Sequence, residues 1–402
     1  MKINLFMLIL SFTIIQKIEG QNSWILKGNF GGPGRQLSVS FSIGTKGYIG
    51  TGRDYGSNYY NDFWEYDPAA NSWTQKANFA GLPRQGAVGF SIGNKGFIGT
   101  GHIVTGQMLS DFWEYDLPTN TWSQKTDFAG GKRMSAIGFS INDKGYIGTG
   151  NDTTTADLND FWEYDTSGNI WTQKADIGAL GRRLAVGFSI GDKGYVGTGA
   201  NSTFLNDFWE YDPSVNIWTQ KTSLSGVPRV FATGFSIGNK GYIGTGYSNG
   251  ANLNDFWEYS PLTDSWIQRA NFGGVGRGDP ASFNIGTKGY IGTGANSIGL
   301  QNDFWEYSPD TTTGITEINS SNNFSIYPIP CNGNFTISYL TSSGKAIFQL
   351  MDSKCRVVYK QSLTGFYGKQ RINVEGLKDG AYYYKIFVCD LVFATGKIVI
   401  LN

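Results

Sequence analysis

Six arginines recur at one place in a repeating pattern, and they are the side chains best suited to bind an anion. Each follows a tryptophan by eleven residues, and the six are Arg35, Arg84, Arg133, Arg182, Arg229 and Arg277. A planar guanidinium offers several N–H donors that match a carboxylate, so six of them around one opening could grip an acidic ligand. The alternative is structural: each arginine pairs with the aspartate that opens a repeated Asp-Phe-Trp-Glu-Tyr segment, such as Asp62.

A second set of positions varies where the arginines do not. It is the residue after each Gly-Thr-Gly segment, and its members are Arg53, His102, Asn151, Ala200, Tyr247 and Ala295. An antiparallel hairpin would bring this position beside the arginines. Unlike side chains around an opening are what a specific pocket needs, whereas identical ones indicate a structural role. We therefore predict that Arg53, His102, Asn151 and Tyr247 are the sharper ligand-binding candidates.

The sequence offers few sets of residues that could catalyse a reaction. His102 is the only histidine, and all three cysteines follow residue 323, so a galactose-oxidase copper centre, which needs two histidines and a Tyr–Cys pair, is excluded. We find no Ser/His/Asp set and no cluster with metal-ligand spacing, and expect neither metal nor cofactor. Asp54 and Asp279 are acids outside the repeat that can be placed near the arginines. A lone buried acid there, in one repeat only, would favour acid–base catalysis.

The elements that must position these residues follow from the repeat itself. The pentapeptide Asp-Phe-Trp-Glu-Tyr begins at Asp62, Asp111, Asp160, Asp207, Asp255 and Asp303. A second ladder interleaves with it, at Trp24, Trp73, Trp122, Trp171, Trp218 and Trp266. A period near fifty residues with strand-like segments is typical of propeller blades. Because every copy carries the tryptophans, we interpret them as core between blades rather than as a sugar platform.

One copy predicts four antiparallel strands. Residues 35–44 alternate between apolar and small polar side chains, and residues 47–52, 61–67 and 72–79 follow after turns. The last copy has no fourth strand of its own, whereas residues 22–30 form a fourth strand that precedes any first strand. We expect residues 22–30 to complete the sixth blade and so to close the ring. The loops between second and third strands differ freely, which marks that face as the functional one.

These repeats resemble the kelch family over residues 22 to about 309. The resemblance lies in the Gly-ended second strand, the tyrosine of the third strand and the tryptophan of the fourth, although Gly-Thr-Gly replaces the usual Gly-Gly doublet. It implies an all-β, six-bladed kelch-like β-propeller over residues 21–309. Kelch propellers mostly bind proteins or sugars. A minority are enzymes, including sialic-acid mutarotases that use only Arg and Glu.

The remaining residues predict a linker and a second domain. Residues 310–323 are rich in Thr, Ser and Asn and read as a linker. From residue 324 short strands recur every 10–12 residues, which predicts a small C-terminal β-sandwich of about seven strands over residues 324–402. Cys331, Cys355 and Cys389 lie there, and they allow at most one internal disulfide whose pairing stays open.

This tail resembles the C-terminal type A sorting domain of the type IX secretion system of Bacteroidota. The matching residues are Tyr327, Pro328, Pro330, Gly333, Phe335, Gly380, Tyr382, Gly396 and Lys397. Two departures are Ile329, where the family usually has Asn, and Cys355, where it usually has Gly. The resemblance implies that the secretion machinery carries the protein across the outer membrane. The tail is then often removed, which leaves the protein released or anchored at the cell surface.

The amino terminus and the charge agree with export. Lys2, the apolar residues 5–15 and a polar exit predict a signal peptide over residues 1–20, and eleven apolar residues are too few to span a bilayer. Residues 324–402 hold nine basic and four acidic side chains, a net +5, so the rest carries −5. Neither part has the basic excess that nucleic-acid binding requires. We expect a soluble monomer.

The sequence thus predicts a secreted or cell-surface binding protein, whose variable-loop face takes a glycan or a protein. The alternative is a sugar-acid epimerase or lyase, or another carbohydrate-active enzyme, on the same scaffold.

Overall fold

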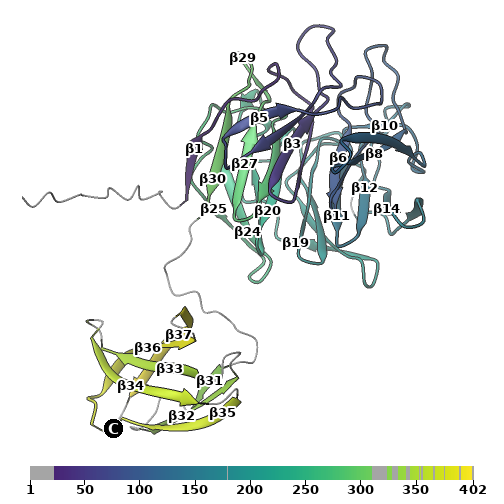
Figure 1. Ribbon diagram of the computed structural model, residues 1–402. Coiled ribbons are helices and arrows are strands. Elements are labelled where there is room, and N and C mark those ends of the chain that lie inside the picture. The colour runs from purple at the N-terminus through teal and green to yellow at the C-terminus, as the bar shows by residue number, and fades with distance from the viewer. Residues whose placement is uncertain are drawn as a thin grey trace, which may run out of the picture. The chain divides into compact units, whose positions relative to one another are not determined.

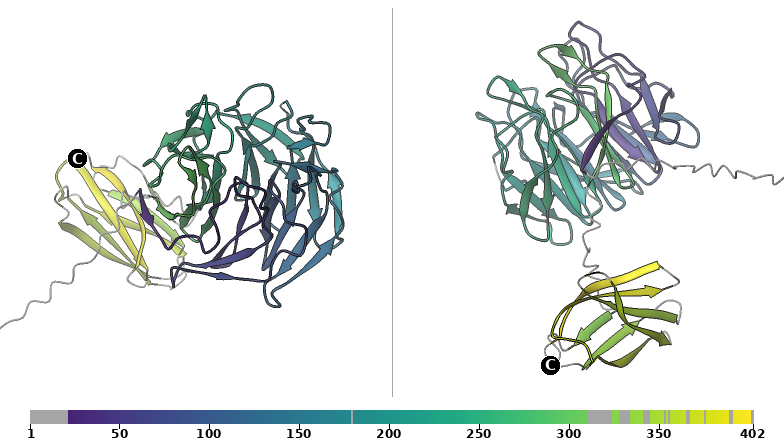
Figure 2. Two further views of the ribbon diagram at one scale, coloured as in Figure 1. Left: turned by 90° about the horizontal axis from the view of Figure 1, so that it is seen from above. Right: turned by 90° about the vertical axis from the view of Figure 1, so that its left-hand side faces the viewer.

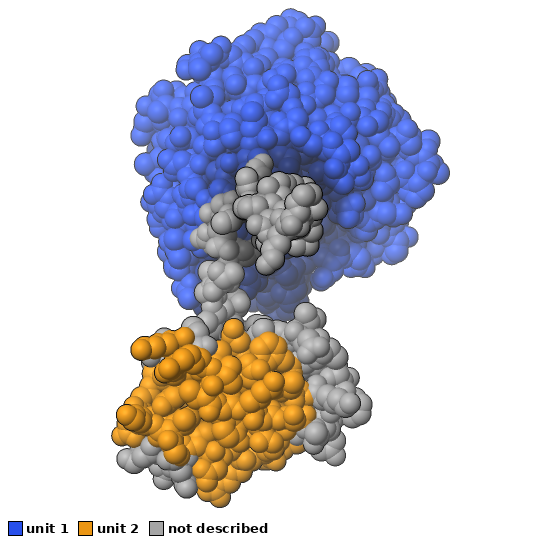
Figure 3. Space-filling view, turned by 60° about the vertical axis from the view of Figure 1, so that its left-hand side comes forward, with its two compact units in different colours: residues 1–310 blue, residues 311–402 orange. Residues whose placement is uncertain are grey.

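The chain forms two compact units, Met1–Asp310 and Thr311–Asn402 (Figure 3). A computed structural model describes residues 22–178, 180–309, 324–327, 334–340, 345–352, 354, 356–364, 367–374, 376–388 and 391–400. The predicted signal peptide and linker lie outside these residues. Every regular element among the described residues is a strand, and the fold is all-β.

The first unit consists of six four-stranded antiparallel sheets (Figure 1). The first holds β2 (Val39–Ile43), β3 (Lys46–Gly50), β4 (Phe63–Asp67) and β5 (Ser72–Gln75), and the second β6 (Val88–Ile92), β7 (Lys95–Gly99), β8 (Phe112–Asp116) and β9 (Thr121–Lys125). The third holds β11 (Ile137–Ile141), β12 (Lys144–Gly148), β14 (Phe161–Asp165) and β15 (Ile170–Gln173). The fourth holds β16 (Val186–Ile190), β17 (Lys193–Gly197), β18 (Phe208–Asp212) and β19 (Ile217–Lys221). The fifth holds β20 (Thr233–Ile237), β21 (Lys240–Gly244), β24 (Phe256–Ser260) and β25 (Ser265–Gln268).

The sixth sheet joins the two ends of the repeat region. Its strands are β26 (Ala281–Ile285), β27 (Lys288–Gly292), β30 (Phe304–Ser308) and β1 (Ser23–Leu26). β1 pairs antiparallel with β30 and sets Trp24 opposite Tyr307. The first strands of the six sheets form a continuous ring of contacts, from β2 through β6, β11, β16, β20 and β26 back to β2 (Figure 2). The unit is therefore a six-bladed propeller.

Aromatic side chains fill the spaces between blades because glycines face them. A Cβ atom on Gly47 would lie 2.0 Å from Cε2 of Phe283 in the neighbouring blade, so only glycine admits that ring. Trp24 packs edge-on against Phe256, with ring centroids 5.0 Å apart, and its indole N–H donates to the Ala270 carbonyl at 3.1 Å. All six ladder tryptophans donate in this way to a backbone carbonyl of the adjacent blade. They are packing residues between blades.

The first strand of each blade is shorter than the alternation predicts. In the first blade the strand begins at Val39, and Leu37 has a φ of +55°. A residue in that left-handed region cannot continue a strand, so the alternation of Leu37 with Val39 does not extend one face of the sheet. Short two-stranded sheets lie outside the six blades: β10 (Arg133–Met134) with β13 (Asn151–Asp152), and the hairpins of β22 (Tyr247–Ser248) with β23 (Ala251–Asn252) and of β28 (Ala295–Asn296) with β29 (Gly299–Leu300).

The second unit is a small β-sandwich. One sheet holds β31 (Phe324–Tyr327), β32 (Asn334–Leu340) and β35 (Tyr367–Asn373). The other holds β34 (Val357–Thr364), β33 (Lys345–Met351), β36 (Gly380–Val388) and β37 (Leu391–Ile400). Phe335 and Tyr382 lie in its core, and the Tyr382 hydroxyl donates to the Lys378 carbonyl at 2.8 Å.

The other predicted sorting residues are placed only in part. Gly380 begins β36, Tyr327 ends β31, and Gly396 and Lys397 lie on β37. Pro328, Pro330 and Gly333 lie outside the described residues, as do Cys331, Cys355 and Cys389.

Candidate functional site

The six repeated arginines are built into the frame of the blades. Their side chains are at most 1% exposed. In the second blade, the two terminal nitrogens of Arg84 donate to the two carboxylate oxygens of Asp111, each at 2.6 Å, and one also donates to the Thr100 carbonyl at 2.8 Å. The same pairing joins Arg35 to Asp62, Arg133 to Asp160, Arg182 to Asp207, Arg229 to Asp255 and Arg277 to Asp303. The terminal nitrogens of all six are thus occupied by a carboxylate, although Nε of Arg133 and of Arg182 is buried without an acceptor.

These pairs hold the loop before each first strand against the start of the third strand. Burial by itself would raise the pKa of the Asp207 carboxyl, but the hydrogen bonds and charge of Arg182 outweigh it and hold that pKa below its ordinary value. None of the six arginines lines either of the cavities described below. This geometry favours the structural alternative that the sequence left open.

The variable position after each Gly-Thr-Gly lies where the hairpin geometry places it, beside the residue that follows the arginine. The bridged pairs are Gln36 with Arg53, Gln85 with His102, Met134 with Asn151, Arg183 with Ala200, Val230 with Tyr247 and Gly278 with Ala295. Both members of each pair therefore face the same end of the central channel as the variable loops.

A third set of residues lines the channel mouth, and of its members sequence reasoning singled out only Asp279. Each lies two places after a repeated arginine: Leu37, Gly86, Ser135, Leu184, Phe231 and Asp279. All six have φ between 55° and 58°, and neighbouring blades are joined here by backbone N–H···O=C bonds, such as that from Asp279 to Phe231 at 2.9 Å. Backbone contacts fix this conformation, so the side chain is free to vary. Comparing the copies two residues after each arginine would have revealed the set.

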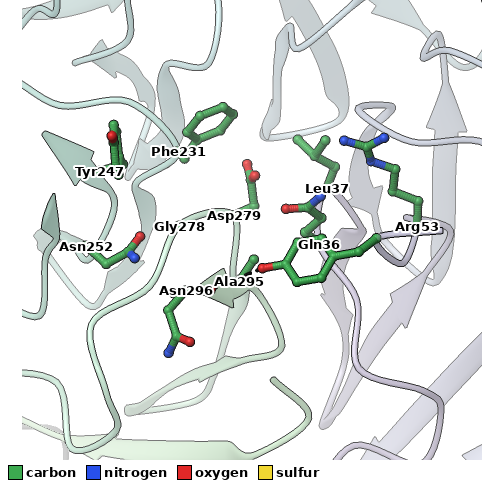
Figure 4. Close-up of a pocket in the computed structure, with 11 residues that line it drawn as sticks. Gln36, Leu37, Arg53, Phe231, Tyr247, Asn252, Gly278, Asp279, Ala295 and Asn296 are labelled. Carbon is green, nitrogen blue, oxygen red and sulfur yellow. Dashed lines mark hydrogen bonds between the residues drawn. The ribbon is translucent and has the colours of Figure 1, made fainter. Parts of the chain in front are cut away.

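One cavity of about 310 Å³ opens at this mouth between the fifth, sixth and first blades (Figure 4). Its lining comprises Gln36, Leu37, Arg53, Tyr55, Phe231, Tyr247, Asn252, Gly278, Asp279, Ala295 and Asn296. The cavity exists because the sixth blade has small side chains at Gly278 and Ala295. A Cβ atom on Gly278 would lie 3.3 Å from Cβ of Phe231 and 4.0 Å from Oδ1 of Asn252, so a larger residue there would enter the cavity.

Two ionisable side chains in this cavity lack a protein partner. Among the described residues, neither the Arg53 guanidinium nor the Asp279 carboxyl has an ion pair or a side-chain hydrogen bond, and Nε of Arg53 is buried without an acceptor. Burial raises the pKa of the Asp279 carboxyl well above its ordinary value, and the charge of Arg53 opposes that rise only in part. Figure 4 shows Arg53 and Tyr247 on opposite sides of Asp279. Unpaired groups of this kind mark a ligand site.

The other candidates lie elsewhere on the same face. His102 is half-buried, with Nδ1 3.3 Å from Nε2 of Gln85, and its pKa is lowered by burial and by the charge of Arg53. Asn151 pairs with Met134 in the third blade, and Ala200 lines a second cavity. Asp54 accepts hydrogen bonds from the side chain of Asn58 and the backbone of Gly56, so it stabilises its own exposed loop.

Within the described ranges, no three His, Cys, Asp or Glu side chains gather closely enough to hold a metal ion. The same part of the chain has no helix with the length and hydropathy to cross a membrane.

Comparisons with known proteins identify the tail and the fold. Residues 325–401 match the family model of the secretion system C-terminal sorting domain. A solved structure entitled "Structure of YjhT" is similar to the chain with a TM-score of 0.60 and 16% identity, covering 69% of this chain and 95% of that one. A search of curated proteins gave no match. The tail supports export to the cell surface or the medium through the secretion machinery, and the structural likeness shows the fold alone.

Proposed function

We propose that this chain is an exported binding protein that takes a glycan in the cavity between its fifth, sixth and first blades. The observation that carries the proposal is that Arg53 and Asp279 face this cavity without protein partners. The arginines of the frame all have such partners. Nε of Arg53 is buried, and a desolvated polar group without a partner is costly in a finished fold, so a ligand that satisfies it gains affinity. The Asp279 carboxyl is partly exposed, and a ligand that covers it must supply a hydrogen bond in place of water.

The rest of the lining fits a hydroxylated ring. Tyr247 and Phe231 offer flat apolar faces, and the amides of Gln36, Asn252 and Asn296 offer both donors and acceptors. At about 310 Å³ the cavity is at the small end of ligand pockets, which span about 300–1,000 Å³. A single sugar ring suits this space better than a protein, because a standard protein–protein interface buries about 800 Å² on each partner.

A glycan array probed with the full mature chain tests the proposal, followed by calorimetry on the sugars that bind. Gly278→Val should fill the cavity and abolish binding. Met134→Val is the matched control, because it places the same side chain at the equivalent position of the third blade and should leave binding unchanged. Binding that survives Gly278→Val would place the site elsewhere.

A second candidate function is a carbohydrate-active enzyme such as a sugar-acid epimerase, and Asp279 is the observation that favours it. The residue occurs in one blade only, and burial raises its pKa above the ordinary aspartate value, as a general acid requires. NMR of each bound sugar would reveal interconversion of its stereoisomers. An enzyme should lose turnover in Asp279→Asn while retaining binding. A binding protein should show no interconversion with either chain.

Export is tested by deleting residues 324–402. A folded propeller that stays in the periplasm would support the role of the tail, whereas continued appearance at the surface or in the medium would contradict it.

A further inference from the structure

A second, larger cavity lies beside the first on the variable-loop face. It has a volume of about 520 Å³ and lies between the fourth and fifth blades. Its lining comprises Arg183, Ala200, Asn201, Ser202, Thr203, Phe204, Pro228, Ser248 and Asn249. Side-chain hydroxyls and amides dominate this lining, and both can donate and accept hydrogen bonds.

A single hairpin separates the two cavities. In the hairpin of β22 and β23, Tyr247 pairs with Asn252 and both line the first cavity. Ser248 and Asn249 of the same hairpin line the second cavity. The Tyr247 ring also meets the Phe204 ring edge to face, with centroids 6.4 Å apart, and Phe204 belongs to the second cavity. The wall between the cavities is thus one layer of side chains thick.

The two cavities differ in charge. Arg183, the cation of the second cavity, is neutralised by Asp157, because one guanidinium nitrogen lies 2.7 and 2.8 Å from the two carboxylate oxygens. The second cavity therefore offers neutral hydrogen-bonding groups, while the first offers the unpaired Arg53 and Asp279. A ligand that fits both would be rich in hydroxyls at one end and would carry a group that satisfies the Arg53 guanidinium and the Asp279 carboxyl at the other.

We propose that the ligand is an oligosaccharide that crosses the hairpin and occupies both cavities. One sugar unit lies between Arg53 and Tyr247, and further neutral units lie over Ser248 and Asn201. A peptide is a poorer fit, because most side chains that line the second cavity carry hydroxyls or amides, which suit sugar hydroxyls better than the apolar side chains of a peptide. This inference rests on the proposed glycan binding, since it extends the same site to a second subsite.

Chain length is the decisive variable. The probes are matched monosaccharides, disaccharides and tetrasaccharides of neutral and uronic-acid sugars, first on an array and then by calorimetry with the full mature chain. We expect the tetrasaccharide to bind at least about tenfold more tightly than the monosaccharide of the same series. Equal affinity across a series would overturn the second subsite, while the glycan proposal would stand.

A blocking variant separates the two subsites. Ser202 is exposed, so Ser202→Trp should fill the second cavity without disturbing the core. It should lower tetrasaccharide affinity to that of the monosaccharide and leave monosaccharide affinity unchanged. Thr153→Trp, on the exposed loop of the third blade, is the control and should change neither. If Ser202→Trp leaves the tetrasaccharide affinity intact, the inference is wrong. If no sugar binds the unaltered chain, the proposed function itself fails.

Discussion

The second and sixth blades have the same backbone at the channel mouth but opposite patterns of side-chain size. In the second blade the three mouth residues are Gln85, Gly86 and His102, and in the sixth they are Gly278, Asp279 and Ala295. The central residue has a φ of 58° in one blade and 55° in the other, and the flanking residues are bridged in both. Two large residues flank a glycine in the second blade, whereas two small residues flank an aspartate in the sixth.

This difference shows that the backbone of the blades places equivalent residues at the mouth, while the side chains at those positions decide whether a cavity forms. In the second blade Gln85 and His102 approach each other at 3.3 Å and fill the space above the mouth. In the sixth blade the space is open and Asp279 projects into it. The glycine that the second blade has at the left-handed position is not required there, because the residues at this position in the other five blades are not glycine and adopt nearly the same φ. Side-chain volume, rather than backbone geometry, distinguishes these two blades.

The largest expected effect tests whether the frame is the same in both blades. Arg84→Ala and Arg277→Ala should each lower the free energy of unfolding by about 3–5 kcal/mol, because each leaves a desolvated carboxylate unpaired. Urea unfolding of both variants measures this. The comparison breaks if Arg277→Ala keeps its stability and loses ligand binding, because the sixth-blade arginine would then belong to the site and an acidic ligand would become the leading idea.

A smaller effect on stability, but a large one on binding, should follow from converting one mouth into the other. Gly278→Gln with Ala295→His gives the sixth blade the flanking residues of the second. The added volume should cost about 1–3 kcal/mol and should abolish sugar binding, because the new side chains occupy the cavity. Calorimetry and thermal unfolding of the same sample separate the two effects. Unaltered affinity in a folded variant would show that cavity volume is not what makes the sixth blade special.

The sequence predicted the frame far better than the site. The pentapeptide and tryptophan ladders recur in every copy, and the all-β propeller that they predicted is confirmed, as is the sorting tail. The variable position after Gly-Thr-Gly includes Arg53 and Tyr247, which line the cavity, and His102 and Asn151, which do not. Leu37 and its counterparts were assigned to strands, because alternation along one chain cannot reveal a left-handed turn imposed by the neighbouring blade. The cavity depends on side-chain sizes in three blades, which no single repeat contains.

A further expected effect is the pH dependence of stability that Asp279 contributes in the sixth blade. Burial raises the pKa of Asp279 in the folded state, so folding favours its protonated form. That contribution to stability is complete below the ordinary aspartate pKa of about 3.9 and is lost as pH rises through the raised folded value. Asp279→Asn removes this loss, so the variant should gain stability relative to the unaltered chain as pH increases from about 4 to 8. A difference that does not change with pH would mean that Asp279 is solvated or paired.

The smallest expected effect is the pH dependence of stability that His102 contributes in the second blade, and its sign is opposite to that of Asp279. Burial lowers the pKa of His102, with a further contribution from the charge of Arg53, so folding favours the neutral imidazole. The unfolded chain binds more protons below the ordinary histidine pKa of about 6.5, and stability is therefore lost as pH falls through that value toward the lowered folded one. His102→Gln should gain stability relative to the unaltered chain at acid pH, where Asp279→Asn gives no advantage. Thermal unfolding of both variants and of the unaltered chain at matched pH values measures this. The advantage in melting temperature over the unaltered chain should grow with rising pH for Asp279→Asn and with falling pH for His102→Gln. If His102→Gln instead gained stability as pH rises, the folded protein would favour the charged imidazole, and the filled mouth of the second blade would stabilise a cation rather than exclude one.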